Sequence, residues 1–298
     1  MTDCSGDSGS NGMDEDLEIT ARFSRQELVR GWRERTCAPP RVVPVTRLGL
    51  KTDLGAVREN NEDKAEFYEP NDAGVLASRG ALYVVADGMG GHAAGQIAAE
   101  LAIKKVLSEY YDGTADSPGQ ALLDAFEVAN EHVRSVARAI PGRSGMGTTL
   151  TALALVEDQA VLCHVGDSRA YLIRGDQIRQ VSEDHSWVAE QVRAGALTEA
   201  EAESSPYRNV ITQCIGPLAE IAPDISAVET QPGDRWLLCT DGLTGHVADH
   251  ELLAVASGQS PSEACRRLVE LANSRGGRDN ITVMIVDITG LAPWPESS

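Results

Sequence analysis

The feature that most restricts the possible folds is a series of short apolar runs that follow one another without helical patterns between them. Residues 81–88, 148–156 and 159–167 are such runs, and residues 170–181 hold two more around the turn residues Gly175 and Asp176. Strands this close in sequence pair antiparallel, because a parallel pair needs a crossover of about a dozen residues or more. The sequence therefore predicts largely antiparallel sheets.

Two other segments have the pattern of helices with one buried face. Residues 118–140 repeat apolar side chains at intervals of three and four. Ser117 and Pro118 suit the N-cap and the first helical position, and Gln120 is placed to complete a capping box. A second helix starts in the same way at Ser260 and ends before two glycines at 276 and 277.

The N-terminal region differs in composition from the rest of the chain. Residues 1–18 are mostly Gly, Ser, Asp and Glu, which predicts disorder, and a capping pattern at Ser24 predicts a short helix before a proline-rich linker. We expect residues 1–44 to be an appendage, residues 45–290 to form one folded domain and residues 291–298 to be a tail. Trp32 and nearby arginines leave a second interpretation open, in which the appendage is a docking adaptor.

Charge and cysteine content restrict the partners and the location. The formal net charge of −19 argues against a nucleic-acid partner, because phosphate contacts need clustered Lys and Arg. No apolar run approaches the roughly 20 residues that span a bilayer, and the start lacks the pattern of a secretory signal. The six cysteines are scattered without metal-site or redox spacing. We expect a cytoplasmic protein with reduced thiols and no membrane partner.

Four segments combine acidic residues with glycine where predicted strands begin or end. Each alone is explained by turn chemistry, since Asp-Gly after a strand commonly forms a turn. Their joint occurrence points to a carboxylate cluster, which would need cations to offset the repulsion. Oxygen ligands without a His or Cys pattern favour magnesium or manganese. The segments are residues 55–63, 85–95, 239–245 and 276–282.

The same segments, with GMGTTL at 145–150 and GDSRAYLIR at 166–174, occur in an order that resembles the metal-dependent protein phosphatases, the type 2C serine/threonine phosphatases. The resemblance covers residues 48–288, and DGMGG is similar to the bacterial branch. It implies an α+β fold, a four-layer αββα arrangement with a central β-sandwich of two antiparallel sheets flanked by helices. It also implies hydrolysis of phosphoserine and phosphothreonine in phosphorylated proteins.

The resemblance implies metal-ligand roles for the strand-end residues. Asp87 would bridge two manganese or magnesium ions, and the Gly88 carbonyl would bind the second ion. Asp241 and Asp279 would complete the ligands of the first ion. Asp167 would help bind a third, weaker ion, although a turn-capping role for this residue stays open.

Three further residues receive roles from the same resemblance. Glu62 and Asp63 would act mainly through metal-bound waters. Arg58 would bind the substrate phosphate, since guanidinium donates two parallel hydrogen bonds to phosphate oxygens. A hydroxide bridging the two cations would then attack phosphorus in line.

One position departs from the pattern of some family members. Met89 stands where they carry a histidine that acts as general acid, and methionine cannot donate a proton. Metal-bound water or a neighbouring histidine would have to replace it, and His92 is the nearest in sequence, although a helix-start role explains it equally well.

Residues 184–216 resemble the family's flap beside the active site, which would affect substrate choice.

Two interpretations of the function compete. The first is an active phosphatase, monomeric, opposing a cognate serine/threonine kinase. The second is a catalytically silent module that binds phosphoproteins. The presence of all three central aspartates favours the first.

Overall fold

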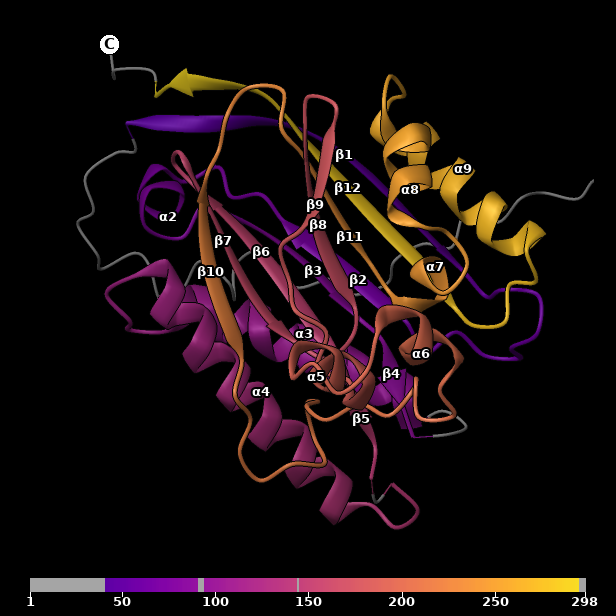
Figure 1. The fold of residues 1–298 in the computed structure, drawn as a ribbon. Helices are drawn as coiled ribbons and strands as arrows, with labels where there is room; N and C mark the ends of the chain where they lie inside the picture. The colour runs from indigo at the N-terminus through magenta and orange to yellow at the C-terminus, as the bar shows by residue number, and fades with distance from the viewer. Residues whose placement is uncertain (1–40, 91–93, 144, 295–298) are drawn as a thin grey trace, which may run out of the picture.

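Two five-stranded antiparallel sheets packed face to face form the centre of the molecule, with helices over both outer faces (Figure 1). The computed structural model describes residues 41–90, 94–143 and 145–294. The prediction of a four-layer α+β sandwich is confirmed. The first sheet has the order β1 (Val42–Asp53), β12 (Ile281–Pro293), β11 (Arg235–Cys239), β8 (Arg169–Arg174), β9 (Gln177–Gln180). The second has the order β10 (Asp224–Glu229), β7 (Gln159–Val165), β6 (Leu150–Val156), β3 (Ala81–Ala86), β2 (Lys64–Tyr68).

The helices lie on the two outer faces and in the flap. The second sheet is covered by α3 (Ala94–Asp112) and α4 (Pro118–Ala139), and the first by α7 (Asp241–Thr244), α8 (Asp249–Ala256) and α9 (Pro261–Ser274) (Figure 1). The remaining elements are α2 (Ala73–Ser78), α5 (Trp187–Arg193), α6 (Glu199–Ser204) and the two-residue pair β4 (Gly88–Met89) with β5 (Gly147–Thr148).

Three apolar layers hold the sandwich together. Phe126 lies in the layer between the second sheet and its helices, Trp236 between the two sheets, and Leu268 between the first sheet and α9. Every residue of β6 is buried because this strand is covered on both faces. That explains why its sequence is a continuous apolar run instead of an alternating one.

The two predicted helices begin where the capping residues placed them. The Ser117 hydroxyl accepts a hydrogen bond from the Gln120 amide, and Ser260 accepts one from Glu263. The prediction that the Gln120 side chain completes a capping box is wrong, because this side chain donates a hydrogen bond to Asp124 at 2.7 Å instead. Each helix therefore depends on a single side-chain cap.

The paired strands extend past the domain limits that we predicted at residues 45 and 290. β1 starts at Val42, which pairs with Pro293 at the end of β12. Pro44 is accommodated because β1 is an edge strand, where a missing amide donor costs no sheet hydrogen bond. The predicted helix after Ser24 lies outside the described residues. None of the described helices is long and apolar enough to cross a bilayer.

Candidate metal and phosphate site

Four aspartates meet at one end of the sandwich because of strand direction. β3 and β7 both pair antiparallel with β6, so their carboxyl ends lie at the same edge, where Asp87 and Asp167 follow them. β11 and β12 are antiparallel neighbours, so Asp241 after β11 lies beside Asp279 before β12. The structure therefore brings together the four strand-end carboxylates that the sequence singled out.

Backbone hydrogen bonds fix the position of Asp87. Its amide donates to the Thr149 hydroxyl at 2.8 Å, and its carbonyl accepts from the Thr149 amide and the Thr148 hydroxyl, both at 2.8 Å. The Thr149 hydroxyl also contacts the Ser168 hydroxyl at 2.7 Å, next to Asp167. Two buried threonines thus connect two of the carboxylate-bearing turns. Both threonines belong to the GMGTTL motif, which by itself predicted no role for them.

Asp63 lies beneath the other carboxylates and is almost fully buried, with 1% exposure. Its Oδ2 accepts a hydrogen bond from the Thr240 hydroxyl at 2.8 Å, whereas Oδ1 is buried without a hydrogen-bond partner. The pKa of Asp63 is raised to about 7, mainly by burial and less by the charges of Asp241 and Asp279, while hydrogen bonds from Thr282 and Thr240 act in the opposite direction. This carboxylate is placed to support the cluster from below.

The remaining carboxylates disfavour one another's charge. Burial, followed by the charge of Asp63, raises the pKa of Asp87 well above its usual range. Burial and the Asp241 charge raise the pKa of Asp167 to about 8. Burial and the Asp279 charge raise the pKa of Asp241. Such a group of like charges is stable as anions only where positive charge offsets the repulsion.

The donor set fits divalent cations. Asp241 Oδ1 and Asp63 Oδ1 are both buried, and neither has a hydrogen-bond partner in the part of the chain that the structure describes. Carboxylate oxygens with unused lone pairs and no competing thiol or imidazole suit magnesium or manganese. Within the described ranges, no three His, Cys, Asp or Glu side chains stand close enough to enclose an ion as they are placed. Cation binding at this site would therefore require the carboxylate side chains to move closer together.

Gly88 lies where the backbone closely approaches two neighbouring segments. A Cβ added there would stand 2.2 Å from the Gly95 carbonyl oxygen and 2.7 Å from the Glu62 carbonyl oxygen. The loop with Glu62 is held by Asn280, whose Oδ1 accepts from the Glu62 amide at 2.8 Å and whose Nδ2 donates to Leu54 O and Asn60 O at 3.0 Å. Asn280 lies in the segment 276–282, but nothing in its sequence predicted this anchoring role.

Arg58 provides positive charge at the rim of the cluster. Its Nη2 lies 2.6 Å from Asp279 Oδ2, and its side chain is 51% exposed. The hydrogen bond that Arg58 donates to Asp279 raises the pKa of Arg58, so the guanidinium stays charged. Part of its donor set faces solvent, where an anionic group can approach it. Met89 lies in β4, and His92 lies outside the described residues.

The predicted flap is a small subdomain between β9 and β10 that contains α5 and α6 (Figure 1). Trp187 and Tyr207 stack edge to face with centroids 5.2 Å apart, and Ser186 bridges to Ile211. Its C-terminal end is joined to the body by a pair of backbone hydrogen bonds between Ile215 and Thr148.

Comparison with known proteins identifies this arrangement. The family model described as Protein phosphatase 2C matches residues 59–280, a range that contains most of the site from Glu62 to Asp279. The chain belongs to the protein phosphatase 2C family. The prediction of a metal-dependent serine/threonine phosphatase of the bacterial type is therefore confirmed at the level of family and enzyme class.

Individual relatives of this phosphatase support the assignment. Protein phosphatase PhpP of Streptococcus pneumoniae is 39% identical over 245 residues, which are 81% of this chain and 97% of the relative. Serine/threonine protein phosphatase PstP of Mycobacterium tuberculosis is 37% identical over 252 residues, 83% of this chain and 46% of that longer protein.

Solved structures agree with the family assignment. The S. agalactiae serine/threonine phosphatase superposes with a TM-score of 0.75 at 34% identity, over 82% of this chain and 100% of its own. The PstP catalytic domain in complex with two manganese ions superposes with a TM-score of 0.71 at 35% identity, over 83% of this chain and 99% of its own.

Proposed function

We propose that this phosphatase hydrolyses phosphoserine and phosphothreonine in proteins with two manganese or magnesium ions held by Asp87, Asp241, Asp279 and the Gly88 carbonyl. The observation that carries the proposal is the convergence of these carboxylates on one end of the sandwich, where Asp241 Oδ1 and Asp63 Oδ1 are buried and have no hydrogen-bond partner among the described residues. Asp167 and Asp241 would share a third, weaker ion, because the charge of Asp241 is the largest electrostatic influence on Asp167 after burial.

The cations would supply an acidified water and neutralise charge on the phosphate. The chain's own residues do the remaining work. Arg58 donates hydrogen bonds to the phosphate and orients it toward the carboxylate cluster. Asp63 and Glu62 orient water molecules around the cluster from below and from the side. The fixed backbone of Asp87 keeps its carboxylate at the centre.

The alternative of a catalytically silent phosphoprotein-binding module finds no support in the site. Such a module would be expected to lack one of the central carboxylates, whereas Asp87, Asp241 and Asp279 are all present and adjacent. Their mutual repulsion makes the arrangement costly unless cations are bound, so a pure binding module would gain nothing by keeping it.

Phosphorylated proteins are the substrate class that the family assignment supports. A cognate serine/threonine kinase as opposing partner, a monomeric state and a cytoplasmic location are proposals that rest on the sequence alone.

The decisive experiment is hydrolysis of a phosphothreonine peptide with manganese and with excess chelator, using the wild type and Asp87→Asn. The substitution keeps the side-chain shape but removes its charge, so manganese-dependent turnover should fall by orders of magnitude while the fold persists. Asp72→Asn is the matched control. Asp72 caps α2 after β2, at the opposite end of the sandwich, and asparagine caps equally well. Near-normal turnover in Asp87→Asn would rule out the proposed metal site.

A further inference from the structure

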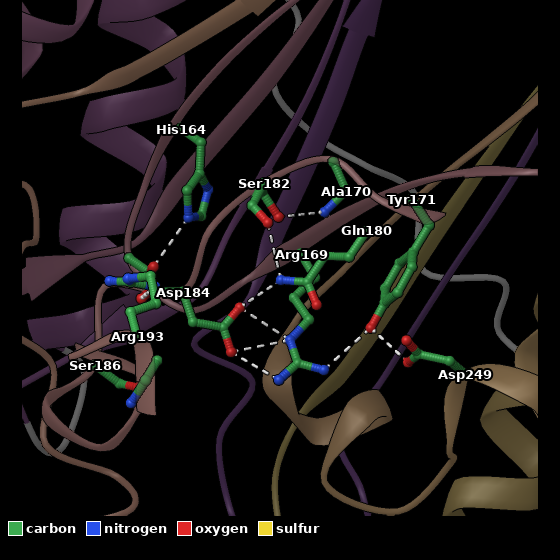
Figure 2. A network of polar contacts seen from close by, with 12 residues as sticks. His164, Arg169, Ala170, Tyr171, Gln180, Ser182, Asp184, Ser186, Arg193 and Asp249 are labelled. Carbon is green, nitrogen blue, oxygen red and sulfur yellow. Dashed lines mark hydrogen bonds and ion pairs between the residues drawn. The ribbon is translucent and has the colours of Figure 1, made fainter. Parts of the chain in front are cut away.

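Two consecutive residues at the base of the flap hold the turn that carries Asp167. The Gly166 amide donates to His185 Nδ1 at 3.2 Å, and the Gly166 carbonyl accepts from the His185 amide at 2.7 Å. On the other side of the turn, Arg169 donates to both carboxylate oxygens of Asp184 at 2.7 to 3.0 Å (Figure 2). The turn between β7 and β8 is therefore bound at both flanks by the start of the flap.

The hydrogen bonds of His185 fix its tautomer. Because Nδ1 accepts from a backbone amide, the ring proton resides on Nε2. Nε2 then donates to Asp224 Oδ2 at 2.9 Å, and Asp224 is the first residue of β10, where the chain leaves the flap. The ring is buried, with 7% exposure for the residue as a whole. His185 is thus a neutral bridge between the Asp167 turn and the end of the flap.

A second buried imidazole fixes the same peptide. His164 accepts from the Thr151 hydroxyl at Nδ1 and donates from Nε2 to the Gly166 carbonyl at 2.9 Å. Gly166 adopts a φ of +116°, and a Cβ there would stand 2.6 Å from Thr149. The carbonyl before Asp167 therefore accepts two hydrogen bonds and cannot shift without breaking them. The two rings lie 5.2 Å apart.

His185 also joins the two ends of the flap to each other. Its carbonyl accepts from the Thr212 amide at 2.8 Å, next to the bridge between Ser186 and Ile211. One residue therefore contacts the returning flap segment at Thr212, the flap exit at Asp224 and the turn of Asp167.

We propose that His185 is a positioning residue that couples the flap to the Asp167 carboxylate. By holding Gly166, it sets where Asp167 stands relative to Asp241, and by holding Asp224 and Thr212, it sets where the flap stands over the substrate. Substrate engagement by the flap and cation binding at Asp167 are then linked through one residue, by its ring to Gly166 and Asp224 and by its carbonyl to Thr212. The proposal rests on the proposed phosphatase function and adds a residue to which neither the sequence nor the family resemblance gave a role.

Two conservative substitutions separate the two halves of the bridge. Asparagine places an acceptor near the position of Nδ1, so His185→Asn retains the bond from Gly166 and loses the bond to Asp224. Glutamine places a donor near the position of Nε2, so His185→Gln retains Asp224 and loses the acceptor for Gly166. Asp224→Ala removes the flap-exit bond from the other side, and its side chain is 52% exposed, so the fold should tolerate the change.

The measurements use the full chain. Calorimetry measures manganese binding in the absence of substrate. Steady-state kinetics with a phosphothreonine peptide give KM and kcat. Mass spectrometry measures hydrogen exchange in residues 186–216. His185→Gln should weaken the weakest manganese-binding step about three- to tenfold, the equivalent of one hydrogen bond. His185→Asn and Asp224→Ala should leave manganese binding unchanged, raise KM by a similar factor and speed exchange in the flap.

The proposal is overturned if all three variants shift manganese binding and KM equally, because a structural role would not separate them. The proposal is also overturned if no variant changes manganese binding or KM. If the His185 variants fail to fold, Asp224→Ala decides the question, and wild-type KM and flap exchange in that variant would overturn the proposal. A wild type that binds manganese but hydrolyses no phosphopeptide would refute the proposed function instead, while the calorimetry would still decide the role of His185.

Discussion

Replacing Arg58 with alanine should separate substrate binding from metal binding. The side chain is half exposed, and its ion pair with Asp279 spans 2.6 Å at the protein surface. A surface ion pair contributes about 0–1 kcal/mol, so the melting temperature should change little. A hydrogen bond to a charged phosphate contributes about 1.5–3 kcal/mol, which corresponds to a rise in KM of about 10- to 100-fold. The predicted loss is therefore one of substrate affinity.

Arg266→Ala is the matched control for this prediction. Arg266 lies on α9, pairs with Glu263 at 2.7 Å and is also 51% exposed, but it is remote from the carboxylate cluster. Its KM should remain that of the wild type. Steady-state kinetics on a phosphothreonine peptide at saturating manganese, with a manganese titration of each variant, give the comparison.

Two results would refute the assignment of Arg58. A fall in kcat with unchanged KM would mean that the guanidinium acts only in the transition state. Weaker manganese binding would mean that Arg58 organises the metal ligands instead of the phosphate. Removing a cation from beside Asp279 should leave manganese affinity unchanged or slightly higher, because the carboxylate loses a competing positive charge.

Two further predictions follow from the site and the domain limits. Asp167→Ala should lower turnover and shift the manganese dependence of turnover, while the melting temperature stays nearly constant. A destabilised variant with an unchanged manganese response would show that Asp167 only caps its turn. Deletion of residues 1–40 should leave peptide hydrolysis intact, because β1 begins at Val42, and loss of activity on that deletion would show that the segment belongs to the catalytic body.

The central strands β3, β6 and β7 were predictable because their sequences carry a local signal, whereas helix α3, which covers the second sheet together with α4, was not predicted. α3 has ten buried residues distributed around its axis, since it packs against both the second sheet and α4. A helix buried on several faces shows little amphipathic contrast, and periodicity is the main signal of a helix in sequence. α4 was predicted correctly because only one of its faces is buried.

The acidic residues of the site could be predicted for a different reason. Aspartates in turns at strand ends are individually common, but strand direction places all four carboxylates at one end of the sandwich, and the order of the motifs in sequence resembles a known family. The residues that hold them have no such signal. Thr149 and Asn280 act through hydrogen bonds to backbone groups that are far away in sequence, and nothing in a linear pattern marks which threonine or asparagine will be buried beside an aspartate.

His185 shows where the limit of sequence reasoning lies. Its position at the start of the flap was evident, but its role depends on which ring nitrogen accepts and which donates, and those partners are Gly166 and Asp224. A histidine that makes two hydrogen bonds of opposite sense is held in a single tautomer and orientation. In this phosphatase that orientation joins the flap to a carboxylate-bearing turn, so a residue outside the metal site can affect both substrate and cation binding.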